Sequence, residues 1–261
     1  MASLKGLVAF IAGGASGLGK ATMLHLLRQG ARVYSFDMQA FKAEENVDLG
    51  RILFTRGDVR DEYQVQTAFE ECHEKFGRID AIVNCAGVSI SFFTFNPKKQ
   101  RVHSLRDFND VLSINLTGTY NVVRLGVGYL AKNEPSDETN QLRGTVITTS
   151  GLSSFDGQLG QTTFSATAGG IEGMTSPLAG EFALQGIRCV NICPGYFHTP
   201  IFSRAGKDFL QFFENYAVCP RRLGKSEEYA KLVETILTNT YISNTSITLN
   251  GAMMPYIFPF L

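Results

Sequence analysis

Short apolar stretches alternate with amphipathic stretches along the chain, and this alternation predicts an α/β fold. Residues 7–11 have the pattern of a buried strand, and residues 20–28 have the periodicity of a helix that Gly30 ends. We expect further strands at residues 32–36, 52–54, 79–83, 145–149, 188–192 and 246–249. We expect further helices at residues 65–76, 107–131, 162–184 and 227–237, and a polar surface loop at residues 133–140.

Strands and helices that alternate in this order predict a doubly wound parallel sheet with helices on both faces, as in Rossmann-type folds. The 261 residues contain no internal repeat, low-complexity tract or linker, so we expect a single domain over residues 1–261. Hydrophobic residues make up 44% of the chain and charged residues 18%, which is typical of a globular protein with a substantial core.

Charge and composition argue against several functional classes. The formal net charge is +0, with 24 Lys+Arg against 24 Asp+Glu, so charge indicates no direct binding of nucleic acid or of an anionic membrane. The five cysteines form no C-x-x-C pair and the histidines show no metal spacing, which favours buried thiols and no metal site. No stretch reaches the roughly 18 apolar residues of a membrane span. The early first strand also leaves no room for a cleaved signal peptide.

A glycine-rich turn with the sequence GGASGLG follows the first strand and opens the first helix, at residues 13–19. Glycines at this place permit a tight turn and let the backbone approach a pyrophosphate, and the helix N-terminus supplies free N–H groups. The position between strand and helix therefore predicts a dinucleotide site. Its expected contacts in the turn are Gly13, Ser16, Gly17, Leu18 and Gly19.

Acidic and small residues after the later strands extend this predicted site. Asp37 ends the second strand, eighteen residues after Gly19, where a carboxylate can accept hydrogen bonds from the adenosine ribose. The same carboxylate would repel a 2′-phosphate, which favours NAD over NADP. We expect an adenine contact from Asp58 and Val59, and a close approach of the cofactor to Asn84, Cys85, Ala86 and Gly87.

Taken in order, these motifs resemble the short-chain dehydrogenase/reductase family. The matching landmarks also include Asn115, Pro194-Gly195 and Thr199, and the resemblance covers essentially the whole chain. Within the family, the chain resembles the type 2 3-hydroxyacyl-CoA dehydrogenases, also called type 10 17β-hydroxysteroid dehydrogenases. The stretches that carry this closer likeness are residues 5–9, 75–78, 133–135, 222–224 and 249–252.

The resemblance implies that Pro194, Phe197 and Thr199 complete an NAD site. It also implies NAD-dependent oxidation of hydroxyacyl-CoA thioesters or hydroxysteroids by a mitochondrial homotetramer, and a link to RNA-processing protein partners. A cytoplasmic location is the alternative. We expect residues 112–129 and 162–184 to form the tetramer, and the apolar residues 256–261 to pack into an oligomer or partner interface. Residues 201–216, rich in aromatic side chains, are expected to form either a substrate lid or helices that pack on the body.

The chain departs from the family at its proton-transfer group. In the family a tyrosine exchanges a proton with the substrate oxygen, a lysine four residues on lowers the tyrosine pKa and binds the nicotinamide ribose, and a serine thirteen residues before the tyrosine holds the substrate oxygen. These positions here hold Phe164, Ala168 and Gly151, while the family's asparagine is retained as Asn115. We therefore expect impaired or lost catalysis in a structural or regulatory subunit. NAD binding is also expected to be weaker, because Ala168 cannot contact the ribose.

An active NAD-dependent oxidoreductase on 3-hydroxyacyl-CoA or hydroxysteroid substrates is the alternative hypothesis. It requires another group to move the proton, and the candidates are Ser150, His198, Tyr196 or a water held by Asn115. Ser150 lies one residue before the family's serine position, and a slip of one residue along a strand turns a side chain to the other face. His198 has an imidazole that titrates near neutral pH.

Overall fold

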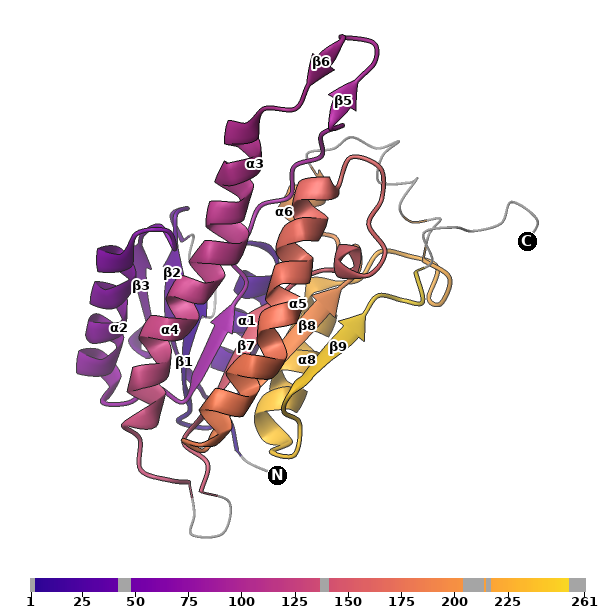
Figure 1. Cartoon of the computed structure of the whole chain (residues 1–261). Coiled ribbons are helices and arrows are strands. Elements are labelled where there is room, and N and C mark those ends of the chain that lie inside the picture. Colours follow the sequence, from indigo (N-terminus) through magenta and orange to yellow (C-terminus); the bar gives the residue numbers. More distant parts are fainter. Residues whose placement is uncertain (1–2, 42–47, 137–140, 204–213, 215–216, 254–261) are drawn as a thin grey trace.

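The computed structural model describes residues 3–41, 48–136, 141–203, 214 and 217–253 (Figure 1). Its central feature is a sheet of seven parallel strands in the order β3-β2-β1-β4-β7-β8-β9. The strands are β1 (Val8–Ala12), β2 (Arg32–Asp37), β3 (Ile52–Arg56), β4 (Ala81–Asn84), β7 (Gly144–Thr149), β8 (Ile187–Pro194) and β9 (Thr245–Leu249).

Helices cover both faces of this sheet and bury a separate apolar cluster on each (Figure 1). One face is covered by α1 (Gly17–Arg28) and α8 (Ser226–Thr238), which pack against each other. The other face is covered by α2 (Glu62–Phe76), α4 (Gly118–Ala131) and α5 (Thr162–Ala183). Burial from both sides explains why β1 is continuously apolar rather than alternating, and why every residue of β8 is buried, including Arg188 and Asn191. The prediction of a doubly wound, Rossmann-type sheet is confirmed.

Element boundaries differ from the sequence predictions mainly where polar residues begin a helix. Helix α2 begins at Glu62 and not at residue 65, because the Asp61 side chain accepts a hydrogen bond from the Gln64 N–H and caps its first turn. The β5–β6 hairpin (Phe95–Asn96 and Arg101–Val102) was not predicted, because two-residue strands are too short to show alternation. The remaining short elements are η1 (Leu49–Arg51), η3 (Leu152–Ser154) and α6 (Pro200–Ser203).

The prediction of a single regular helix over residues 107–131 is wrong. It consists of α3 (Leu105–Leu112), a π-helical turn η2 (Ser113–Thr117) and α4. Single π-turns inside α-helices frequently occur at functional sites, and this one contains Asn115. One π-turn changes the spacing of apolar residues too little to be detected in the sequence, so the pattern did not predict it.

The structure bears on the expectations about cysteines, membrane spans and metal ligands. Cys72, Cys189 and Cys193 are buried free thiols as expected, but Cys85 is only partly buried and Cys219 is exposed. Within the described ranges, no helix has the length and apolar character needed to cross a membrane. The same residues contain no cluster of three or more potential metal ligands.

The tail at residues 256–261 and most of residues 201–216 lie outside the described part of the chain.

The β1 core supports a stability prediction. Phe10 is fully buried, and its ring centroid lies 4.0 Å from that of Phe69 and 5.3 Å from that of Tyr34. Phe10→Ala should lower the free energy of unfolding by about 3–5 kcal/mol, because it leaves a cavity between two rings. Tyr63→Ala is the control: Tyr63 is 78% exposed, so the change should stay within about 0.5 kcal/mol. Urea unfolding measures both, and equal losses in the two variants would contradict this account of the core.

Candidate functional site

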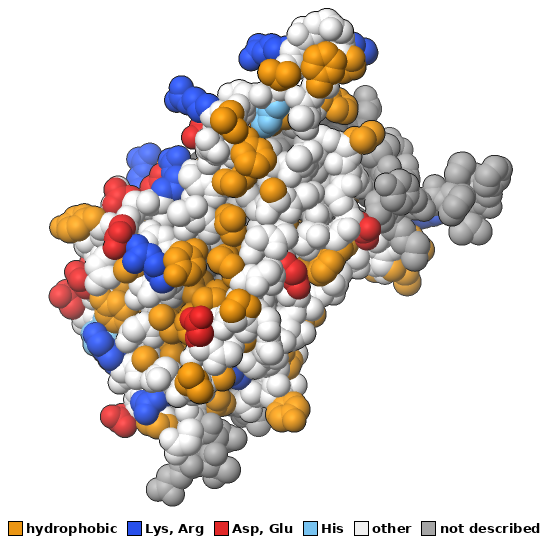
Figure 2. All heavy atoms as spheres, in the orientation of Figure 1, with side chains coloured by type: hydrophobic (Ala, Val, Ile, Leu, Met, Phe, Trp, Pro, Cys, Tyr) orange, Lys and Arg blue, Asp and Glu red, His pale blue; other side chains and the backbone are white. Residues whose placement is uncertain are grey.

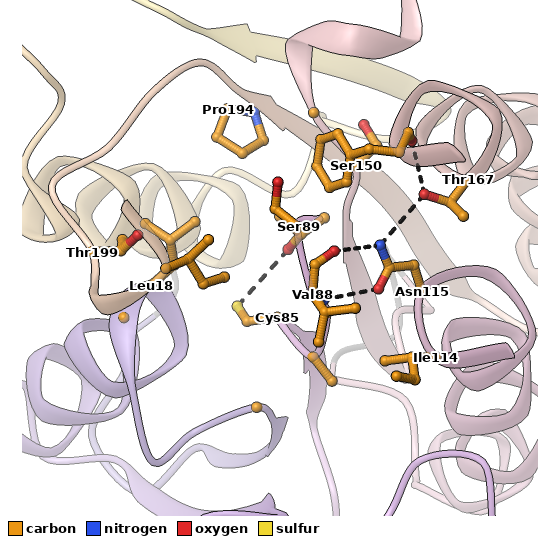
Figure 3. A pocket seen from close by; sticks show the side chains of 18 of the residues that line it. Leu18, Cys85, Val88, Ser89, Ile114, Asn115, Ser150, Thr167, Pro194 and Thr199 are labelled. Atoms are coloured by element: carbon orange, nitrogen blue, oxygen red, sulfur yellow. Dashed lines mark hydrogen bonds between the residues drawn. The ribbon is translucent and has the colours of Figure 1, made fainter. Parts of the chain in front are cut away.

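A cavity of about 280 Å³ lies at the carboxyl ends of the parallel strands. The strand order reverses between β1 and β4, and open α/β sheets bind ligands at such a switch point. The lining comes from the segments at the carboxyl ends of β1, β2, β3, β4, β7 and β8, together with residues of η2 and α5. Figure 3 shows part of this lining. Segments far apart in the sequence therefore meet at one edge of the sheet.

The glycine turn forms one wall of this cavity. Gly13 has φ of +78°, and a Cβ at this position would lie 2.6 Å from the backbone nitrogen of Ala86. Both the left-handed backbone and the close approach require glycine at this position. Of the turn residues predicted to contact a dinucleotide, Gly13, Ser16, Gly17 and Leu18 line the cavity. Gly19 does not line it; a Cβ there would collide with the carbonyl oxygen of Gly13, so its role is to close the turn.

Asp37 lies at the end of β2 and lines the cavity beside this turn. Its Oδ2 accepts a hydrogen bond from the Ala15 N–H at 2.9 Å, and its Oδ1 accepts one from the Gln39 N–H at 2.8 Å. Two backbone bonds thus fix the orientation of the carboxylate, and each carboxylate oxygen can accept a further bond. This arrangement fits the ribose of a dinucleotide.

Most of the other predicted cofactor residues also line the cavity, but Asp58 and Asn84 do not. The lining includes Val59, Cys85, Ala86, Gly87, Pro194, Phe197 and Thr199. Asp58 instead pairs with the guanidinium of Arg60 at 2.6 Å; burial raises the pKa of Asp58, but the bonds from Arg60 outweigh it and hold that pKa below its usual range. Asn84 donates to the Thr119 hydroxyl at 2.6 Å, which ties β4 to α4.

Asn115 holds the loop after β4 from within the π-turn (Figure 3). Its Oδ1 accepts from the Val88 N–H and its Nδ2 donates to the Val88 carbonyl, both at 2.8 Å. The Nδ2 also lies 3.4 Å from the Thr167 hydroxyl on α5. These bonds use most of the hydrogen-bonding capacity of a side chain that is 4% exposed. Asn115 therefore fixes this wall of the cavity.

Gly151, Phe164 and Ala168 line the same cavity as Asn115. Phe164 and Ala168 lie one turn apart on α5, and Gly151 follows β7. A Cβ on Gly151 would lie 3.0 Å from Cε1 and 3.3 Å from Cζ of the Phe164 ring. The three positions singled out by resemblance are thus brought together, and none of them carries a polar side chain.

The residues considered as replacements fare differently. Ser150 lines the cavity, but its hydroxyl lies 3.0 Å from the Cys193 sulfur and accepts a hydrogen bond from Asn191 at 2.9 Å. The candidacy of His198 is not supported, because this side chain is exposed and is not part of the described lining. Tyr196 does line the cavity, and Gln161 donates a hydrogen bond to its phenol oxygen at 3.3 Å.

Ionisable groups are sparse along the described lining. They are Asp37, Cys85 and Tyr196. Burial raises the pKa of the Cys85 thiol to about 11, so this thiol stays protonated near neutral pH. Sequence reasoning missed Ser153, a buried residue of the lining; the only available sign was a hydroxyl residue two positions after Gly151.

Comparison with known proteins places this geometry in a family. A family model described as short chain dehydrogenase matches residues 7–209. The chain belongs to the short-chain dehydrogenase family. It is 44% identical to human 3-hydroxyacyl-CoA dehydrogenase type-2 over 253 residues, which is 96% of each protein. It is 34% identical to the ipsdienol dehydrogenase of Ips pini, over 98% of this chain and 100% of that protein.

A solved structure agrees with these relatives. The crystal structure of 3-hydroxyacyl-CoA dehydrogenase type-2 from Mycobacterium avium matches with a TM-score of 0.88 and 32% identity, over 95% of this chain and 96% of that chain. Membership in the short-chain dehydrogenase family and the dehydrogenase relatives imply a nicotinamide cofactor. The glycine turn and the oriented Asp37 carboxylate fit such a cofactor.

The turn geometry predicts the effect of one added methyl group. Gly13→Ala should weaken NADH binding about tenfold or more, because the Cβ meets the Ala86 backbone and the left-handed φ becomes strained. Gly128→Ala is the control, since a Cβ at that position of α4 meets nothing within 4 Å. Titration by NADH fluorescence checks both. Unchanged affinity in a folded Gly13→Ala protein would show that the cofactor does not use this turn.

Proposed function

We propose that this protein binds NAD in a short-chain dehydrogenase cavity, has impaired or no hydride-transfer activity, and works as a structural or regulatory subunit. The observation that carries the proposal is the presence of Phe164 and Ala168 in the cavity wall beside Asn115. The scaffold that orients a dinucleotide is present, while the side chains at the expected proton-transfer positions are a phenyl ring and a methyl group.

Proton transfer is the step that this wall does not support. Bound NAD would supply a hydride acceptor, and an alcohol substrate must release its hydroxyl proton to a nearby base as the hydride leaves. Phe164 has no oxygen that can accept that proton, and Ala168 has no charge that could assist another group. Asp37 lies three strands away from β7 in the sheet, which is about 14 Å at the usual strand spacing. It is therefore too distant to act there as a base.

The preference for NAD rests on Asp37. Its carboxylate is held at the end of β2 by the Ala15 and Gln39 backbones, so it cannot turn away from a 2′-phosphate without breaking those bonds. The weaker binding of NAD rests on Ala168, which is 2% exposed and presents only a methyl group to the cavity.

Asp37→Asn tests this preference while preserving the shape of the side chain and an acceptor oxygen. The affinity for NADPH relative to NADH should rise about tenfold, because the repulsion between two negative charges is removed. Fluorescence titration with both nucleotides gives the ratio. Wild-type protein that binds NADPH as tightly as NADH would contradict the assignment of NAD.

An active dehydrogenase is the second candidate, and Tyr196 is the observation that favours it. Its phenol lines the cavity and accepts a hydrogen bond from Gln161, so an ionisable oxygen is present in the wall. The dehydrogenase names of the relatives also support this candidate. Substrate oxidation would then depend on Tyr196 in place of position 164.

Turnover of 3-hydroxybutyryl-CoA with NAD separates the two candidates. Wild type should be silent or at least about 10²–10⁴-fold slower than Phe164→Tyr/Ala168→Lys/Gly151→Ser, because positioned acid–base catalysis contributes about that factor. Tyr196→Phe in the wild-type chain is the matched control. Strong wild-type turnover that Tyr196→Phe abolishes would replace the first candidate by the second.

Assembly and location complete the proposal. Helix α5 spans 22 residues with only two charged side chains, Glu172 and Glu181, and small residues on it face solvent. Apolar side chains are also visible on the helical face of the isolated chain (Figure 2). These features support a homotetramer formed by α4 and α5. A measurement of the protein's mass in solution tests this assembly. A mitochondrial location and further protein partners rest on the resemblance alone.

A further inference from the structure

Ser153 has a buried hydroxyl that no group in the described part of the chain satisfies. The residue is 7% exposed and lines the cavity, and its Oγ has no hydrogen-bond partner there. A buried polar atom without a partner costs about 1–3 kcal/mol, so native proteins rarely retain one without a reason. A ligand oxygen inside the cavity would supply the missing partner.

The Ser153 hydroxyl lies next to the space that a side chain at residue 151 would fill. Ser153 lies in η3, which follows β7 directly. A Cβ on Gly151 would lie 3.7 Å from the Ser153 Oγ and 3.3 Å from Cζ of Phe164. Cζ is the carbon that carries the hydroxyl in a tyrosine. The Ser153 hydroxyl thus borders the volume that a side chain at position 151 would occupy, beside the ring position from which a tyrosine would act.

The other two serines near Gly151 are already engaged. Ser150 contacts Cys193 and accepts from Asn191, and the Ser154 hydroxyl donates to the Gly151 carbonyl at 2.9 Å. Ser153 is therefore the serine of this group whose buried hydroxyl has no hydrogen-bond partner among the described residues. A serine at position 151 itself would crowd Phe164, since its Cβ would lie 3.0 Å from the ring.

We propose that Ser153 binds the oxygen of the ligand in this cavity, and so takes over the role that resemblance assigns to position 151. The inference rests on the proposed function, because it assumes that the cavity binds an oxygen-bearing ligand next to a nicotinamide cofactor. The ligand class is a molecule with a hydroxyl or carbonyl oxygen on an apolar skeleton, since Leu152, Phe164 and Ile171 also line the cavity. The site has then lost its proton-transfer pair but kept a holder for the ligand oxygen.

The test uses the full chain with Phe164→Tyr and Ala168→Lys, and leaves Gly151 and Ser153 unchanged. This double variant should oxidise 3-hydroxybutyryl-CoA with NAD, because Ser153 already holds the substrate oxygen. Adding Ser153→Ala should lower kcat about a hundredfold, as expected when a donor to the reacting oxygen is removed. Adding Ser165→Ala is the matched control, since Ser165 also has a buried unpaired hydroxyl but is not part of the described lining.

Two further measurements separate this role from a structural one. Ser153→Ala should leave NADH affinity and the Tm of the ligand-free protein unchanged or slightly higher, because it removes an unpaired polar atom. A double variant that binds NADH but turns over only after Gly151→Ser is added would overturn the inference, as would Ser153→Ala without effect on kcat. Wild type that binds no NADH would instead overturn the proposed function, and the inference with it.

Discussion

The close backbone contact between the turn after β1 and the loop after β4 is the constraint on which the cavity depends. Gly13 approaches Ala86 so closely that no side chain fits between them. Because β1 and β4 are neighbours at the point where the strand order reverses, this contact sets the width of the switch-point crevice. The Asp37 carboxylate extends the same constraint to β2 through its bond to the Ala15 N–H.

A second set of bonds ties β4 and the loop after it to α4 and the π-turn. Asn84 is bonded to Thr119, the Thr119 hydroxyl donates to the Asn115 carbonyl at 2.6 Å, and the Asn115 side chain holds Val88. These bonds give Asn115 a structural role: its loss would leave partly buried backbone groups of Val88 without their partner. Phe164 and Ala168 face the cavity, and their side chains make no hydrogen bonds that the fold requires, so substitution there changes chemistry with little cost to the scaffold.

Local motifs made the fold, and the residues that line the cavity beside the glycine turn, predictable from sequence. The glycine turn and Asp37 follow strands whose apolar runs are clear, and the geometry of a strand-turn-helix is set within about thirty residues. Other features depend on contacts between distant segments. Packing decides three of them: the ion pair between Asp58 and Arg60, the π-turn around Asn115 and the exposure of His198. The hydrophobic periodicity of the sequence carries no information about such contacts. Ser153 belongs to the same class, because a short helix after β7 turns it into the cavity.

The positions 151 and 164 form one physical unit in this chain. A Cβ at residue 151 would lie 3.0 Å from the Phe164 ring, so a side chain there requires the ring to shift slightly, and the glycine leaves room for the ring. Substitutions at residues in contact are not additive, so a serine restored at 151 alone meets the ring and gains no proton acceptor. A tyrosine restored at 164 alone likewise lacks the lysine that would lower its pKa. The departures from the family pattern are therefore coupled: restoring one residue alone restores little catalysis while the others remain changed.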